Sequence, residues 1–294
     1  MLELAGLGLG TAPLGGLYEP VDDDTAHAVV ERAWHLGIRY FDTAPYYGSG
    51  NAERRLGAAL RERPRDEFVV STKVGRLLRP GESGWHGAPT LEAYFDFSHD
   101  AALRSLEASL ERLGLDRVDI ALVHDPDDHY DEALAGAFRA LARLRDEGVV
   151  RAVGVGMNRT ALLCRFAREA NPDCFLVAGR YTLLDRSAGD ELLPLCAEHG
   201  IAVIAGGVFN SGVLAGGNTF DYQAASPSVV ARAAELRETC ARFGVPLAAA
   251  AVQFPPRNDA VACVLVGCRT PAEVEEDVRL FELDLPSGLW DELV

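Results

Sequence analysis

Short apolar segments alternate with longer segments of helical periodicity along the whole chain. Each apolar segment is bounded by turn-forming residues, a pattern that indicates buried β-strands. The predicted strands lie at residues 6–10, 38–41, 68–72, 118–123, 150–155, 175–178, 201–205 and 261–266. The helices predicted to follow them lie at residues 25–36, 51–61, 100–113, 131–147, 160–170, 189–199, 227–243 and 271–281. Further helical segments are expected at residues 247–254 and in the tail, 289–294.

This regular alternation predicts a parallel sheet that helices cover, because parallel strands need crossover connections. Repeated strand–helix units over a chain of 294 residues favour an α/β fold, a (β/α)₈ TIM barrel with residues 1–294 as a single domain. The alternative is a doubly wound open sheet. In a TIM barrel the active site lies at the carboxyl ends of the strands.

Ionisable residues stand at the ends of three successive predicted strands. The segment IRYFDTAPYYG at 38–48 delivers Asp42 and Tyr47, FVVSTK at 68–73 ends in Lys73, and VDIALVH at 118–124 ends in His124. Singly, each has an ordinary interpretation as a cap or a solvated turn residue. Together at matching strand ends they indicate a site for acid–base chemistry.

Composition and charge narrow the class of protein. The chain is 48% hydrophobic and 24% charged, which is typical of globular proteins, and its net charge is −16 without a basic patch. Nucleic acid and anionic membranes are therefore not expected as partners. No apolar stretch approaches the roughly 20 residues that span a bilayer, and the start of the chain lacks signal-peptide features. Six cysteines without CxxC spacing indicate buried reduced thiols and a cytoplasmic location; no metal site is predicted.

The order and spacing of the strand-end residues resemble those of the aldo-keto reductases along nearly the whole chain. The family's motif DTAxxYG at the end of the second strand matches DTAPYYG at residues 42–48. The family's lysine on the third strand matches Lys73, and its histidine on the fourth matches His124. The resemblance implies a catalytic tetrad of Asp42, Tyr47, Lys73 and His124.

The side chains of this tetrad suit proton transfer beside a nicotinamide, which carries the hydride. A tyrosine with its free pKa of about 10 is a poor base at neutral pH. The Lys73 ammonium is expected to favour the phenolate, with Asp42 holding that ammonium in place. His124 is expected to polarise the substrate oxygen. Tyr46 is chemically identical to Tyr47 and remains an alternative, because only the family's five-residue offset from Asp42 favours Tyr47.

The cofactor must be bound without a Rossmann fingerprint, because Pro13 stands where the third glycine of GxGxxG would fall. Gly10 and Thr11 lie at the end of the first strand that faces the predicted site, and both are expected to contact the cofactor. The segment 206–214 after the seventh strand would offer backbone N–H groups to a pyrophosphate, with a flexible loop as the alternative. Its expected cofactor contacts are Phe209, Asn210, Ser211, Gly212 and Leu214.

The segment 267–271 after the eighth strand opens a helix, whose N-terminus is a natural phosphate site. Gly267 belongs to this site, and Arg269 is expected to pair with a phosphate, with a surface cap as its alternative role. Gly267 and Glu273 stand where many NADPH-dependent family members carry basic residues. A carboxylate there repels a 2′-phosphate, so NAD is predicted as the cofactor, with NADP as the alternative through Arg269.

Other cofactor contacts come from the resemblance alone. Asn158 matches the family's asparagine that holds the carboxamide, and Glu276 and Asp277 align with positions near the adenosine. The chain departs from the family at Gly206, where an aromatic residue usually stacks on the nicotinamide. Phe209 or Tyr181 would have to substitute for it.

The substrate prediction rests on likeness to the sugar 1-dehydrogenases of the L-fucose, D-threo-aldose and L-galactose type. The supporting segments are LVHDPD at 122–127, GGVFNSGVL at 206–214 and VPLAAAAVQFP at 245–255. That subgroup oxidises an aldose to a lactone with NAD, and it includes pyridoxal dehydrogenases. Trp85, in the long connection 77–98, suits stacking on a sugar or anchoring of the loop. Asp125 and Asp127 suit binding of hydroxyls or capping of the next helix.

Three functions are therefore compared: an NAD-dependent aldose dehydrogenase, an NADPH-dependent carbonyl reductase, and a cofactor-sensing subunit that does little chemistry. The tetrad argues against the third. A small-molecule sugar or carbonyl compound is the expected partner in the first two, and the sequence does not indicate an oligomeric state.

Overall fold

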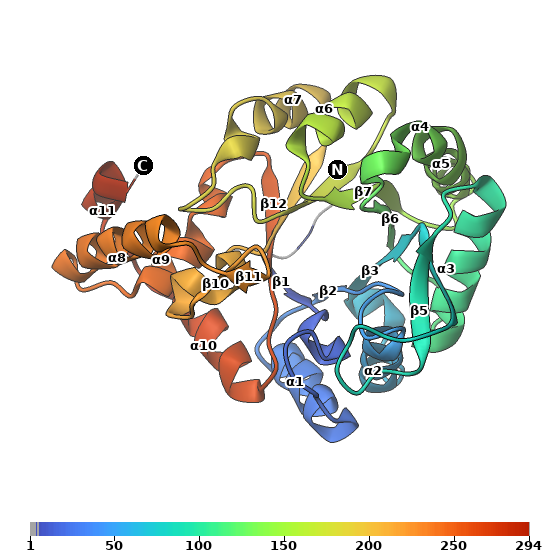
Figure 1. The fold of residues 1–294 in the computed structure, drawn as a ribbon, viewed down its shortest axis with the longest axis horizontal. Helices are drawn as coiled ribbons and strands as arrows, with labels where there is room; N and C mark the ends of the chain where they lie inside the picture. The colour runs from blue at the N-terminus through green and yellow to red at the C-terminus, as the bar shows by residue number, and fades with distance from the viewer. Residues whose placement is uncertain (1–3, 5, 294) are drawn as a thin grey trace.

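The structure is a computed structural model that describes residue 4 and residues 6–293. Eight parallel strands close into a barrel, surrounded by a ring of helices (Figure 1). The barrel strands are β1 (Leu7–Gly10), β2 (Tyr40–Asp42), β3 (Val69–Val74), β6 (Ile120–His124), β7 (Ala152–Met157), β8 (Cys174–Ala178), β9 (Ala202–Gly206) and β12 (Val261–Val266). The predicted barrel is confirmed. The open-sheet alternative is wrong, because β1 pairs with both β2 and β12 and so closes the sheet.

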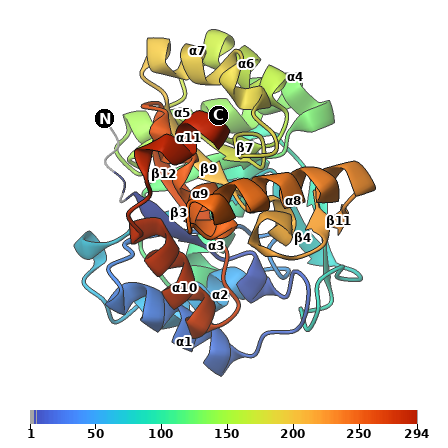
Figure 2. The same ribbon diagram turned by 90° about the vertical axis from the view of Figure 1, so that its left-hand side faces the viewer.

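The predicted helices are present around this barrel, and Figure 2 shows them from the side. They are α1 (Asp23–His35), α2 (Asn51–Leu60), α3 (His99–Leu113), α6 (Thr160–Glu169), α7 (Leu192–His199), α8 (Pro227–Arg242), α9 (Leu247–Gln253), α10 (Pro271–Glu282) and α11 (Ser287–Leu293). Side-chain caps fix several starts: Asp22 accepts from the Thr25 amide at 2.7 Å, and Thr270 from the Glu273 amide at 3.2 Å.

The predicted helix at 131–147 is interrupted. It consists of α4 (Tyr130–Ala133), a π-helical segment η4 (Leu134–Phe138) and α5 (Arg139–Asp146). The Ala137 amide donates to the Phe97 carbonyl at 2.7 Å, which draws the backbone out of regular α-helical bonding. At Gly136 a Cβ would lie 2.4 Å from the same carbonyl oxygen, so only glycine allows this approach.

Two hairpins lie in connections that the sequence analysis treated as loops. β4 (Arg76–Pro80) pairs antiparallel with β5 (Leu91–Phe95), and β10 (Thr219–Phe220) pairs antiparallel with β11 (Gln223–Ala224). The first hairpin was missed because its proline and glycine residues read as a loop. Pairing with a partner strand across the hairpin overrides that local signal.

Two apolar clusters form the core. One fills the barrel interior and contains Tyr40, Ile120, Leu122, Ala152, Cys174, Leu176, Ile204, Cys263 and Leu265. The other lies between the strands and the helices and includes Phe41. Successive strand residues face opposite sides, so Tyr40 and Asp42 share the inner face while Phe41 faces the helices. All six cysteines are buried and free, which confirms the prediction of buried thiols.

Helix α2 packs against the end of α3 at Gly57, where a Cβ would lie 1.8 Å from the Leu113 carbonyl oxygen. Alanine normally stabilises a helix interior relative to glycine. At this position we expect Gly57→Ala to lower the free energy of unfolding by about 1–3 kcal/mol, because α2 and α3 must separate. Urea unfolding followed by circular dichroism measures the change.

Gly288→Ala in α11 is the matched control, because its Cβ would meet its nearest neighbour, a Phe243 ring carbon, at an ordinary 3.8 Å. We expect this control to be neutral or stabilising. A stabilising Gly57→Ala would show that the α2–α3 contact does not need a glycine.

Candidate active site

Strand alternation brings the predicted catalytic side chains to one mouth of the barrel. Asp42 ends β2, His124 ends β6, and Lys73 lies next to the end of β3. Asp42 pairs in register with Ser71, and Lys73 pairs with Leu122, so these residues face the interior alongside the inner apolar cluster. The parallel sheet places all three at the same, carboxyl edge.

Lys73 and Asp42 form a buried ion pair. The Lys73 Nζ lies 2.7 Å from Asp42 Oδ2 and 2.8 Å from the Thr43 carbonyl oxygen. Their side chains are only 1% and 4% exposed. The other oxygen of Asp42 accepts from the Ser71 hydroxyl at 2.6 Å. Both charges are thus paired and hydrogen-bonded, as buried charges require.

Tyr47 lies in the turn after β2, with its ring against this pair. The Lys73 Nζ is 4.6 Å from the centre of the Tyr47 ring, and the ring of His124 is 5.7 Å away at 89°. The Tyr47 hydroxyl makes no hydrogen bond to any described residue. Tyr46 instead lies under the guanidinium of Arg76, at 4.5 Å. Lys73 therefore contacts Tyr47, the candidate that the family motif favoured, and not Tyr46.

The electrostatic surroundings set the protonation states. Burial raises the pKa of Tyr47 well above its usual value, and the nearby carboxylates of Asp42 and Asp125 raise it further, while Arg76 opposes this. Burial also lowers the pKa of His124 well below its usual value, and the positive charges of Arg76 and Lys73 add to the effect. At neutral pH the site therefore holds a phenol and a neutral imidazole.

The two residues predicted to bind substrate also lie at this mouth. The Trp85 ring is 5.1 Å from that of Tyr46 and 6.0 Å from that of Tyr47. Asp125 forms an ion pair with Arg76 at 2.8 Å. Arg76 was missed by the sequence analysis. The available signal was its position beyond Lys73, because chain that leaves the carboxyl end of a strand stays at the mouth.

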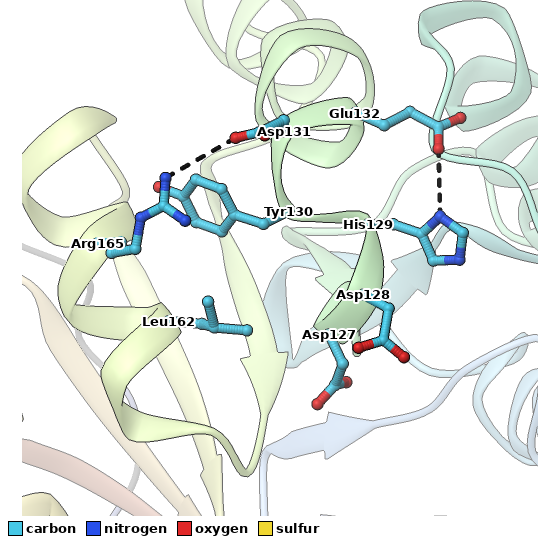
Figure 3. A pocket seen from close by; sticks show the side chains of 8 residues that line it. All are labelled: Asp127, Asp128, His129, Tyr130, Asp131, Glu132, Leu162 and Arg165. Carbon is cyan, nitrogen blue, oxygen red and sulfur yellow. Dashed lines mark ion pairs between the residues drawn. The ribbon is translucent and has the colours of Figure 1, made fainter.

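Two hollows lie near the mouth. One, of about 280 Å³, is lined by Tyr46, Arg76, Ala93, Tyr94 and Phe95. The other, of about 310 Å³, lies between the loop after β6 and α6, and Asp127 lines it (Figure 3). The Asp131 and Glu132 carboxylates at its rim pair with Arg165 and His129. Asp127 and Arg76 thus line different hollows.

The candidate cofactor residues lie in the loops after β1, β7, β9 and β12. Gly10 ends β1, and Thr11 follows it fully buried. Asn158 is exposed directly after β7. Tyr181, a candidate for stacking on the nicotinamide, packs against the Phe254 ring at 5.0 Å.

The loop after β9 has an unusual backbone. Asn210, Ser211 and Gly212 have φ values of 46°, 57° and 105°, within the 3₁₀ segment η6 (Asn210–Ala215). Such conformations are costly for residues other than glycine and concentrate at functional sites. Phe209 is half-buried and Leu214 buried beside them.

The loop after β12 carries a closed set of ion pairs. The Arg269 guanidinium lies 2.6 Å from Glu19 and 2.9 Å from Glu273, and the Arg269 amide donates to Glu273 at 2.6 Å. Gly267 approaches Pro13, where a Cβ would lie 2.9 Å away. Farther along α10, Glu276 pairs with Arg279 at 2.6 Å.

Asp277 lies deeper in α10, where it accepts from the Cys268 thiol at 3.3 Å. Burial raises its pKa to about 7. Within the described part of the chain, no cluster of three or more His, Cys, Asp or Glu side chains is arranged to hold a metal ion. No helix among those residues is long and apolar enough to cross a bilayer.

The depressed pKa of His124 predicts that its ring stays neutral as the pH falls through about 6.5, the usual histidine value. Below pH 6.5 the unfolded chain binds a proton on this histidine that the folded chain does not bind. The free energy of unfolding is therefore highest above pH 6.5 and falls as the pH drops below that value. NMR titration of the ring resonances, assigned with His124→Asn, tests this. The urea-unfolded protein is the control, and a folded-state titration near 6.5 would contradict the prediction.

Comparison with known proteins identifies the family of this chain. The profile of the Aldo/keto reductase family matches residues 6–293. The sequence is 44% identical to D-threo-aldose 1-dehydrogenase of a Pseudomonas species and 43% identical to pyridoxal 4-dehydrogenase of Microbacterium luteolum, each alignment covering 99% of this chain and 94% of the relative. The fold matches a holo aldo-keto reductase of Bacillus halodurans with a TM-score of 0.79 at 26% identity, covering 100% of this chain and 93% of that one. The chain therefore belongs to the aldo/keto reductase family and is an oxidoreductase of the nicotinamide-dependent kind.

Proposed function

We propose that this protein is an NAD-dependent dehydrogenase that oxidises the anomeric carbon of an aldose to the lactone, with Tyr47 exchanging the proton. The observation that carries the proposal is the meeting of Tyr47, Lys73 and His124 at one mouth of the barrel. The likeness to D-threo-aldose 1-dehydrogenase supports an aldose as the substrate.

The loops around the mouth fit a dinucleotide. Among the described residues, Thr11 Oγ1 and Asn210 Oδ1 are buried without a hydrogen-bond partner, which is costly unless a ligand supplies one. When bound, a nicotinamide supplies the hydride acceptor of the oxidation. The chain's residues that would hold the cofactor are Gly10, Thr11, Asn158, Phe209, Asn210, Ser211, Gly212, Leu214, Gly267, Arg269, Glu273, Glu276 and Asp277.

In the oxidation, Tyr47 first releases its phenol proton to solvent at the mouth of the barrel, and the resulting phenolate oxygen then accepts the proton of the anomeric hydroxyl. Lys73, fixed by Asp42 and the Thr43 carbonyl, places its positive charge against the Tyr47 ring and stabilises the phenolate. His124 remains neutral, so it hydrogen-bonds the substrate oxygen without adding a third positive charge beside Lys73 and Arg76. Reduction runs through the same groups, with Tyr47 donating the proton.

The ion pairs of the loop after β12 support NAD over NADP. Arg269, the cation expected to meet a 2′-phosphate, is already paired with Glu19 and Glu273. A 2′-phosphate would have to displace these carboxylates and would then lie beside them, whereas a ribose diol can accept and donate hydrogen bonds there.

A pyridoxal-type dehydrogenase is the second candidate, favoured by the 43% identity to pyridoxal 4-dehydrogenase. The aromatic rings of Tyr46 and Trp85 suit a flat heteroaromatic ring as well as a sugar face. Turnover of an aldose panel and of pyridoxal, followed by NADH absorbance, distinguishes the two. No turnover of any sugar or aldehyde despite cofactor binding would favour the sensing subunit.

Tyr47→Phe is expected to lower kcat by about 10²–10⁴-fold, because the ring stays in place while the proton carrier is lost. Steady-state turnover measures this, and circular dichroism checks that the variant folds. Tyr46→Phe is the comparison variant, since it removes the neighbouring hydroxyl and keeps the ring under Arg76. A larger loss in Tyr46→Phe than in Tyr47→Phe would reassign the proton to Tyr46.

The KM for NADP is expected to exceed that for NAD by about tenfold or more, and Glu273→Gln is expected to narrow the gap. Glu275→Gln is the matched control, because it makes the same charge change on α10 at a residue paired with Arg32. A preference for NADP in the unmodified protein, or equal effects of the two variants, would refute this role of Glu273.

A further inference from the structure

Arg76 and Asp125 come from different segments of the chain and meet beside the tetrad. Arg76 opens β4 and Asp125 follows His124, and their charged groups lie 2.8 Å apart. Asp125 has a φ of 44°, a strained conformation for a residue with a side chain. This conformation keeps its Oδ2 within 3.6 Å of His124 Nε2, so the carboxylate lies at the reacting end of the site.

The contact between Arg76 and Asp125 differs from an arginine–carboxylate pair that only holds a loop in place. In the loop clamp of Arg180, both terminal nitrogens donate to Asp221, at 3.0 and 2.8 Å. No hydrogen bond of regular geometry joins Arg76 to Asp125 in the described part of the chain, and Arg76 Nε there is buried without a partner. The contacts of Asp125 with Arg76 and His124 both involve Oδ2. Donors on Arg76 and an acceptor oxygen on Asp125 therefore remain to be satisfied.

Aromatic rings hold the Arg76 guanidinium in place. It lies 4.5 Å from the centre of the Tyr46 ring and 5.1 Å from that of Phe95. The Tyr46 and Phe95 rings also line the hollow of about 280 Å³ together with Arg76, Ala93 and Tyr94, so Arg76 borders open space beside the tetrad, whereas Asp125, Tyr47 and His124 do not line this hollow. Ring faces pack on the C–H face of a sugar, while fixed polar groups take its hydroxyls.

We propose that Arg76 and Asp125 determine substrate specificity by binding neighbouring hydroxyls of an uncharged sugar, which orients it toward Tyr47 and His124. Asp125 accepts a hydrogen bond from one hydroxyl, and Arg76 donates to the next. A phosphorylated sugar is excluded, because the positive charge of Arg76 is already neutralised by Asp125 in a chain of net charge −16. The inference rests on the proposed aldose dehydrogenase function.

The test compares two substrates of the same enzyme: an aldose that the unmodified protein oxidises, and an aldehyde without hydroxyl groups that it reduces. For Asp125→Asn and Arg76→Lys, the KM for the aldose is expected to rise about tenfold or more, through loss of charge-assisted or forked hydrogen bonds. Because both residues also influence the pKa of Tyr47, the kcat/KM for the plain aldehyde can fall as well, but the ratio of kcat/KM for the aldose to that for the aldehyde is expected to drop about tenfold. For a deoxy-aldose that lacks one of the bound hydroxyls, the rise in KM caused by each mutation should be correspondingly smaller.

Arg79→Gln is the matched control, because Arg79 forms an exposed ion pair with Glu92 in the same hairpin, at 2.7 Å. We expect this variant to leave kcat and KM for both substrates unchanged.

Equal losses of kcat/KM on the aldose and on the plain aldehyde would overturn the inference and show that the Arg76–Asp125 pair only supports His124. An unmodified protein that turns over no aldose refutes the proposed function, and the inference with it. An active unmodified protein whose variants keep its substrate ratio refutes the inference alone. If Arg76→Lys fails to fold by circular dichroism, Asp125→Asn decides.

Discussion

The buried ion pair of Lys73 and Asp42 is the constraint on which the site depends. A charge inside a barrel is tolerated only when its partners replace water, and here the Asp42 carboxylate, the Thr43 carbonyl and the Ser71 hydroxyl do so. Because removing either charge strands the other at a cost of about 3–5 kcal/mol, both are fixed in place. The Tyr47 ring packs against the Lys73 ammonium, which this ion pair holds in position.

The fold was predictable because strand periodicity and barrel geometry are local and repetitive. An apolar strand that ends in a charged residue has one face to fill the interior and one end at the mouth, so Asp42, Lys73 and His124 converge once the sheet closes. The β4–β5 hairpin was not predictable in this way. Its strands are held by each other and by contacts such as Arg76 on Tyr46, between segments whose sequences carry no sign of the pairing.

The same distinction between predictable and unpredictable features applies to the candidate site. The residues of the predicted tetrad could be named from the family motif and the strand ends, whereas their electrostatics depend on distances that the sequence does not contain. Lys73 lies over the face of the Tyr47 ring, and burial and carboxylates dominate the pKa of that tyrosine. The pairing of Arg269 with Glu19 joins residues 250 positions apart. A sequence shows that both exist, but only the closed barrel makes them neighbours.

A common principle connects the charged groups of the mouth. Lys73, Arg76 and Arg269 are each paired with a carboxylate, in a chain that carries a net charge of −16. Paired charges project a weaker field beyond their immediate surroundings than single charges do. They do present donors and acceptors at fixed positions, so a ligand whose polar groups match this geometry binds more tightly. For the proposed aldose substrates, which carry many hydroxyls and no charge, such fixed donors and acceptors would supply the discrimination, because these sugars differ in hydrogen-bond direction and not in charge.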